Sequence, residues 1–188
     1  MLARPSSVGG RGVPGVWLYP ALLALHVAEE APGFTRWAQR HASPHYTQRD
    51  FVRINAAGLA STIATTALVA RSSDRRLFFG WYAAVLTQQA LFNPLFHAGT
   101  TVAFRAYSPG LASSLVFPPL WRRYTRAALR TGRLGPGAVA AAVVLGAAIH
   151  AAAVAQQVFK LQLFGPEARR VMASVAPRRR SAPRVPRP

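Results

Sequence analysis

The sequence predicts an all-α membrane protein, a polytopic bundle of four or five transmembrane helices, and its distribution of charge supports this fold class. Hydrophobic residues make up 51% of the 188 positions, yet the formal net charge is +18. Charged residues are confined to short stretches, because the segments 12–28, 54–70, 77–104 and 134–159 contain no Lys, Arg, Asp or Glu. This segregation excludes a disordered polycation and argues against a nucleic-acid-binding domain, which needs polar faces.

Two spans are predicted in the N-terminal part of the chain. A transmembrane helix needs about 20 mostly apolar residues. The segment 13–34 has this length, although it carries His26, Glu29 and Glu30 toward its end, and 53–70 is shorter and rich in Ser and Thr. We predict that both segments span the bilayer.

Two further spans are predicted downstream, and a third segment is ambiguous. The segments 77–104 and 138–164 are long and apolar, the latter interrupted only by Lys160. The segment 106–121 is uncharged but short, and it contains three prolines. It is a short span, a re-entrant segment or an interfacial loop, so the helix count is four or five.

The expected organisation is a short N-terminal segment (1–12), a transmembrane domain (13–164) and a disordered tail rich in Arg and Pro (165–188). With four or with five spans, the side that holds the C-terminus carries 13 of the 23 basic residues. The positive-inside rule therefore predicts a multi-pass protein of the cell (inner) membrane with a cytoplasmic C-terminus.

Ionisable residues cluster at the end of the first predicted span. His26, Glu29 and Glu30 stand at i, i+3 and i+4, so a helix presents all three on one side. Pro32 and Gly33 follow and are expected to end that helix. Ionisable groups within membrane segments are costly, and this cluster is therefore a candidate functional site.

The third predicted span offers a matching polar stripe. Gln89, Asn93 and His97 recur every four residues, and Pro94 is expected to kink the helix between them. In lipid these polar groups must face the interior of the bundle. We therefore expect the stripe to meet the acidic cluster of the first span.

These residues carry a resemblance to a known family. The motif from His26 to Glu30, with Asn93, His97 and the sequence Tyr-Ser-Pro-Gly at 107–110 downstream, resembles the HXXEE family of small bacterial integral membrane proteins. We place the resemblance from about residue 17 to about residue 160. It implies a site at His26, Glu29, Glu30, Asn93 and His97, but no reaction, since the family has no assigned activity.

The chemistry of these side chains favours a divalent metal, Zn or Fe. The chain has no cysteine, so a metal must be held by nitrogen and oxygen. Adjacent carboxylates near lipid require either a proton or a bound cation. We expect His26, His97 and one of the two glutamates to be ligands, with Glu30 as the candidate. The remaining glutamate would act as general base, and Asn93 would orient substrate or a ligand. The candidate catalytic residues are thus Glu29, Glu30 and Asn93.

The predicted function is that of a metal-dependent hydrolase or isomerase acting on a lipid-like or small hydrophobic substrate. A proton-coupled small transporter, a metal-free acid/base isomerase or a non-catalytic membrane protein would use the glutamate pair as protonatable sites instead. The expected partners are the lipid bilayer and the substrate, with no nucleic acid. Self-association is left open.

Structural roles compete with these functional interpretations. The acidic cluster would then pair with Arg36 or Arg40 outside the membrane. The Asn and His of the third span would serve as interhelical hydrogen bonds. For His150 and Gln157, in the last span, such a packing role is the favoured interpretation.

Overall fold

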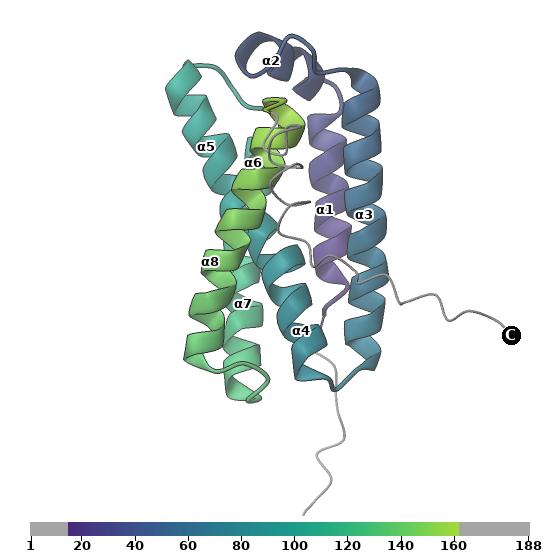
Figure 1. Cartoon of the computed structure of the whole chain (residues 1–188), viewed down its shortest axis with the longest axis vertical. Coiled ribbons are helices and arrows are strands. Elements are labelled where there is room, and N and C mark those ends of the chain that lie inside the picture. Colours follow the sequence, from purple (N-terminus) through teal and green to yellow (C-terminus); the bar gives the residue numbers. More distant parts are fainter. Residues whose placement is uncertain (1–14, 162–188) are drawn as a thin grey trace, which may run out of the picture.

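The computed structural model describes residues 15–161, and all regular secondary structure within that range is helical (Figure 1). The elements are α1 (Leu18–Glu30), α2 (Phe34–His41), α3 (Gln48–Arg71), α4 (Arg75–Trp81), the π-helix η1 (Tyr82–Phe92), α5 (Asn93–Phe104), α6 (Leu111–Ser114), α7 (Phe117–Arg130), α8 (Pro136–Ala153) and the π-helix η2 (Val154–Val158). The predicted all-α class is confirmed. The segment 1–12 and the tail 165–188 lie outside the described residues.

The longer helices run roughly along the long axis of the molecule, and α2 covers one end of it (Figure 1). α1 and α3 lie side by side. The elements α4, η1 and α5 follow one another without a break from residue 75 to residue 104. The chain then returns through α6 and α7, and α8 packs against η1.

Local sequence signals set several helix boundaries. The Thr47 hydroxyl accepts from the backbone N–H of Asp50, whose side chain accepts from the N–H of Thr47, a capping box that begins α3. Asp74 caps α4 in the same manner. As the sequence predicts, α1 ends at Glu30, just before Pro32 and Gly33.

Two helical segments, 48–71 and 136–158, are long and apolar enough to cross a membrane. Only 17% and 11% of the residues in the apolar 18-residue stretches of these two segments are buried within the protein. In the first predicted span, 13–34, the helix α1 has 13 residues. The uncharged segment 106–121 is no single helix, since it contains a turn, α6 and the start of α7. A count of four or five spans remains a prediction.

The main core lies where η1 meets α1, α4 and α7. Tyr82, Leu86 and Ala90 of η1 are fully buried there, together with Tyr19 and Phe117. Each buried aromatic ring removes a large apolar area from water or lipid headgroups, and the phenol hydroxyls find partners. Tyr19, for example, donates to the backbone oxygen of Val85 over 2.9 Å. This packing fixes η1, and with it the position of α5.

Gly146 brings α8 close to the backbone of η1. A Cβ at this position would lie 3.1 Å from the Gln88 nitrogen and 3.2 Å from the Ala83 oxygen, both backbone atoms of η1. We predict that Gly146→Val lowers the free energy of unfolding in detergent by about 1–3 kcal/mol, because η1 backbone cannot move aside cheaply. The control is Gly99→Val, since no atom lies within 4 Å of a Cβ there. Equal melting temperatures for the two variants would contradict this packing.

Candidate functional site

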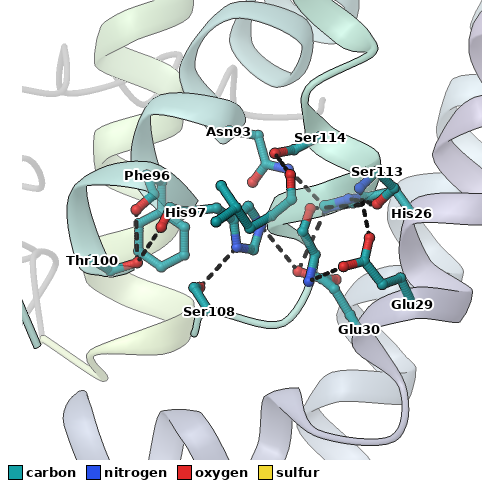
Figure 2. Close-up of polar contacts among 12 residues, drawn as sticks. His26, Glu29, Glu30, Asn93, Phe96, His97, Thr100, Ser108, Ser113 and Ser114 are labelled. Carbon is teal, nitrogen blue, oxygen red and sulfur yellow. Dashed lines mark hydrogen bonds and ion pairs between the residues drawn. The ribbon is translucent and has the colours of Figure 1, made fainter. Parts of the chain in front are cut away.

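Two helices bring the candidate residues together. α1 supplies His26 and Glu30, and α5 supplies Asn93 and His97. The Nε2 atoms of His26 and His97 lie 3.5 Å and 3.4 Å from the same oxygen, Glu30 Oε1. Figure 2 shows these side chains converging between the helices. The expected meeting of the acidic cluster with the stripe of the third predicted span is therefore what the structure shows.

The two imidazole rings are held from behind by serine hydroxyls. His26 Nδ1 lies 2.9 Å from Ser113 Oγ, and His97 Nδ1 lies 2.9 Å from Ser108 Oγ. The Ser113 hydroxyl itself donates to the Gly110 oxygen, so it accepts from an Nδ1–H of His26. This arrangement leaves a lone pair on His26 Nε2, which accepts from the Asn93 amide over 2.8 Å and lies 3.5 Å from Glu30 Oε1. A hydrogen bond at the opposite ring nitrogen is typical of metal-binding histidines.

Gly110 closes the site on the side of the segment 105–110. It has φ +101°, a left-handed conformation that favours glycine. A Cβ here would lie 2.7 Å from His26 Cε1, 2.8 Å from His97 Cε1 and 2.9 Å from Glu30 Cγ. Only a residue without a side chain fits against all three groups.

Glu29 lies beside the three converging side chains but contacts the segment 107–113 instead of joining them. Its Oε1 accepts from the Tyr107 hydroxyl over 2.5 Å and from the backbone N–H groups of Gly110 and Ala112. Its Oε2 accepts from the N–H of Ser113 over 2.7 Å. The carboxylate therefore satisfies the first N–H groups of α6, where negative charge is favourable. This position favours an anchoring role for Glu29 over the general-base role that we expected from the sequence.

The cluster is almost completely shielded from solvent. Exposed fractions are 1% for His26, 7% for Glu30 and 0% for His97. Within residues 15–161, no Arg or Lys pairs with Glu30, and the basic side chains within 4.0 Å of its carboxylate are the two imidazoles. The structural alternative of an ion pair with Arg36 is not seen, because Arg36 donates to the Pro32 oxygen. A buried carboxylate costs several kcal/mol unless its charge is compensated.

The three side chains satisfy the spacing of a metal site. One ligand atom from each of His26, Glu30 and His97 lies within 4.8 Å of the others. Two ligands of a tetrahedral zinc ion, each about 2.0–2.1 Å from the metal, stand about 3.3–3.4 Å apart. The two imidazole-to-carboxylate distances match this value. His97 Nε2 is buried and has no hydrogen-bond partner among residues 15–161.

A large cavity adjoins the cluster. Its volume is about 970 Å³, and it lies between α1, α3, η1 and α8. Glu30 and Asn93 form part of its wall. Uncharged polar side chains line it as well: Asn55, Ser61, Thr62, Gln88, Gln89, Gln156 and Gln157. A cavity of this size accommodates a small organic molecule beside the His–Glu cluster.

Gln89, His150 and Gln157 of the predicted spans line this cavity. Gln89 contributes to the wall but accepts a hydrogen bond from Gln88 and does not join the cluster. His150 is 9% exposed, and its Nδ1 lies 3.3 Å from Gln88 Oε1. That contact agrees with the interhelical packing role predicted for His150. Gln157 is exposed and lines the cavity.

Comparison with known families assigns the chain. Residues 17–122 match the family described as "Protein of unknown function with HXXEE motif". The chain belongs to this HXXEE family. The motif residues are His26, Glu29 and Glu30, the three ionisable groups of α1. The match ends at residue 122, so it does not reach the position near 160 that the sequence suggested. Comparison with curated proteins and with solved structures finds no match.

Several residues of the HXXEE site were not predicted from the sequence. Ser108 and Gly110 belong to the Tyr-Ser-Pro-Gly sequence on which the resemblance rested, but it gave no role to them. Ser113 carried no signal at all. Their functions depend on contacts between segments that are distant in the chain, such as that between His26 and Ser113.

Gly110 and Gly132 provide a matched pair for testing the closure of the site. We predict that Gly110→Ala destabilises the protein by about 1–3 kcal/mol more than Gly132→Ala, because of overpacking at the site. Both glycines have positive φ, so both variants carry the cost of a left-handed alanine, but no atom lies within 4 Å of a Cβ at Gly132. Thermal unfolding in detergent measures the difference. Equal stability would show that Gly110 does not pack against the two imidazoles.

Glu29 and Glu30 are predicted to respond differently to the same substitution in metal-free protein. Glu29→Gln should lower the free energy of unfolding by about 2 kcal/mol, because an amide cannot accept all the backbone N–H groups that the carboxylate accepts. After treatment with a chelator, Glu30→Gln should cost less than Glu29→Gln or even stabilise the protein, because it removes a buried charge that accepts no backbone hydrogen bond among residues 15–161. Chemical or thermal unfolding of both variants checks this. A larger loss of stability for Glu30→Gln than for Glu29→Gln would show that Glu30, and not Glu29, is the anchoring carboxylate.

Proposed function

We propose that this HXXEE protein is a membrane-embedded, metal-dependent enzyme of the hydrolase or isomerase type. The observation that carries the proposal is the state of His97. Its Nε2 is buried, lacks a hydrogen-bond partner and lies 3.4 Å from a carboxylate oxygen that a second imidazole also approaches. A divalent cation accounts for all three features at once, since it takes the lone pairs and compensates the buried charge.

The proposed ligands are His26, Glu30 and His97, and the proposed ion is Zn²⁺ or Fe²⁺. Two histidines and one glutamate form a common catalytic ligand set, which leaves a coordination position open. When bound, the ion supplies Lewis acidity toward a substrate oxygen or a water molecule. The serine contacts at both Nδ1 atoms would keep Nε2 directed at the ion.

The chain's own groups would bind and orient the substrate. Asn93 reaches both the cluster and the cavity, with its Nδ2 2.8 Å from His26 Nε2. An ion at His26 would displace this amide toward the cavity, where it can donate to a substrate oxygen. Glu30 approaches both imidazoles with Oε1, and no hydrogen bond within residues 15–161 engages Oε2. That second oxygen is our candidate for taking up a proton, in place of Glu29.

The proposal places the bundle in the cell (inner) membrane with several spans. The apolar faces of α3 and α8 are barely buried, and exposed apolar side chains such as Leu68, Leu95 and Val144 occur on three different elements. Lipid would cover these surfaces at no cost. The bias of basic residues then places the C-terminus in the cytoplasm. In this setting the cavity beside Glu30 would receive a lipid-like substrate, and homo-oligomerisation is compatible with the exposed faces.

A second candidate function, proton-coupled transport without a metal, is favoured by one contact. The Asn93 amide donates to His26 Nε2, which completes a hydrogen-bonded chain from Ser113 through His26 to Asn93 without any ion. In such a carrier Glu30 alone would be the protonatable group, because Glu29 is engaged with α6. Proton-linked solute flux in liposomes that persists after chelation would support it.

Metal analysis of the purified full-length chain tests the enzyme proposal. We expect about one Zn or Fe per chain, lost in His97→Ala and in Glu30→Gln because each removes a ligand. Ser108→Ala and Ser113→Ala should retain the site but weaken metal affinity about 10- to 100-fold. Elemental analysis and competition with a chelator provide these values.

The matched control is His45→Ala, which removes an exposed imidazole outside the cluster. It should retain the metal of the wild-type chain. Folded wild-type protein without metal, and without affinity for added Zn²⁺ or Fe²⁺, would overturn the proposal.

A further inference from the structure

Two cations stand at one end of the cavity and share one counter-charge. Arg53 and Lys160 both line the cavity. Arg53 Nη2 lies 3.8 Å and Lys160 Nζ 3.1 Å from the same oxygen, Asp50 Oδ1. Asp50 is also engaged by the capping box of α3. This group therefore keeps an excess positive charge at the cavity and can accept another anion.

Lys160 is held in place by the end of α8 and η2. It is the only lysine of the chain, beside 22 arginines. Its backbone has φ +56°, a left-handed conformation unusual for a residue other than glycine, and the following N–H of Leu161 donates to the Ala155 oxygen over 2.9 Å. Only 28% of its side chain is exposed, and Nζ lies 5.3 Å from the centre of the Tyr46 ring. The ammonium is thus positioned by the fold.

Aromatic contacts connect this positive end to the His–Glu cluster. The Tyr46 ring packs against Phe34 at 5.8 Å, and Phe34 packs against His97 at 6.4 Å between ring centres. Tyr46, Phe34 and Glu30 all line the cavity. An anion bound at Lys160 would be separated from the His–Glu cluster by the side chains of Tyr46 and Phe34. The rest of the ligand would extend between α3 and α8, where both apolar and uncharged polar residues line the cavity.

We infer that Arg53 and Lys160 bind the anionic group, a carboxylate or a phosphate, of a single-chain amphiphile whose tail occupies the cavity. Charge-assisted hydrogen bonds from guanidinium and ammonium groups are the usual means of recognising these anions. The reacting bond would then lie near the anionic group and not at the far end of the tail. The inference names the substrate class of the proposed enzyme. The statement about the reacting bond rests on the proposed enzyme function, whereas the binding of the amphiphile does not.

Equilibrium binding to the full-length chain in a non-ionic detergent tests the inference. The probes are oleate and oleoyl-lysophosphatidate, with monoolein as the uncharged amphiphile of the same tail. We expect both anionic probes to bind at least about tenfold more tightly than monoolein, and Arg53→Gln/Lys160→Gln to abolish this preference while monoolein binding stays unchanged. Loss of monoolein binding as well would indicate a misfolded variant, so melting curves accompany each measurement.

The matched control is Arg40→Gln/Arg49→Gln, which removes two exposed charges near the same end of the bundle that do not line the cavity. It should leave the preference intact, and an equal loss would reduce the effect to general surface charge. Competition with inorganic phosphate and with acetate shows whether the site recognises the headgroup of an amphiphile or any free anion. Either one displacing oleate at equal concentration would overturn the inference.

Metal content measured on the same samples separates the two proposals. An anionic preference that depends on Arg53 and Lys160 in metal-free protein would leave this inference standing and remove the proposed enzyme chemistry. A metal-loaded chain without a preference for the anionic probes would overturn the proposed substrate class and leave the proposed enzyme chemistry standing.

Discussion

The four hydrogen bonds accepted by Glu29 are the interaction on which the site depends. They fix the segment 107–113 to the end of α1. That segment carries Ser108 and Ser113, which orient the two imidazoles, and Gly110, which covers them. Without this anchor, α1 and α5 would still carry His26 and His97, but the serine contacts that set the direction of each Nε2 would be lost. The adjacent carboxylates of the motif thus divide two tasks, because one side chain holds the loop and the other faces the buried cluster.

The helix geometry explains why part of the site was predictable from the sequence. The i, i+4 spacing of His26 and Glu30 places them on one face of any helix, as does that of Asn93 and His97. Polar groups in apolar segments must find polar partners, so these two faces were expected to meet. The sequence reasoning therefore identified the three converging residues. It did not separate the roles of Glu29 and Glu30, which occupy neighbouring positions and differ only in what lies opposite them.

The rest of the site could not be predicted because it depends on non-local contacts. Ser113 is 87 positions from His26, and Asn93 is 67 positions from it. The π-helical η1 also has no simple sequence signal, although it sets the register with which α5 enters the site. The all-α class followed directly from the long apolar runs. The number of spans did not, because α1 is short and the helix type changes within residues 75–104.

The family match covers only one part of the walls of the cavity. His26, Glu30, His97 and their supporting loop lie within 17–122, whereas α8, η2 and Lys160 lie beyond it. α8 touches η1 through Gly146, so it forms a wall of the cavity without contributing to the His–Glu cluster. Substitutions in this last helix can consequently change the shape of the cavity while the geometry of the His–Glu cluster is retained.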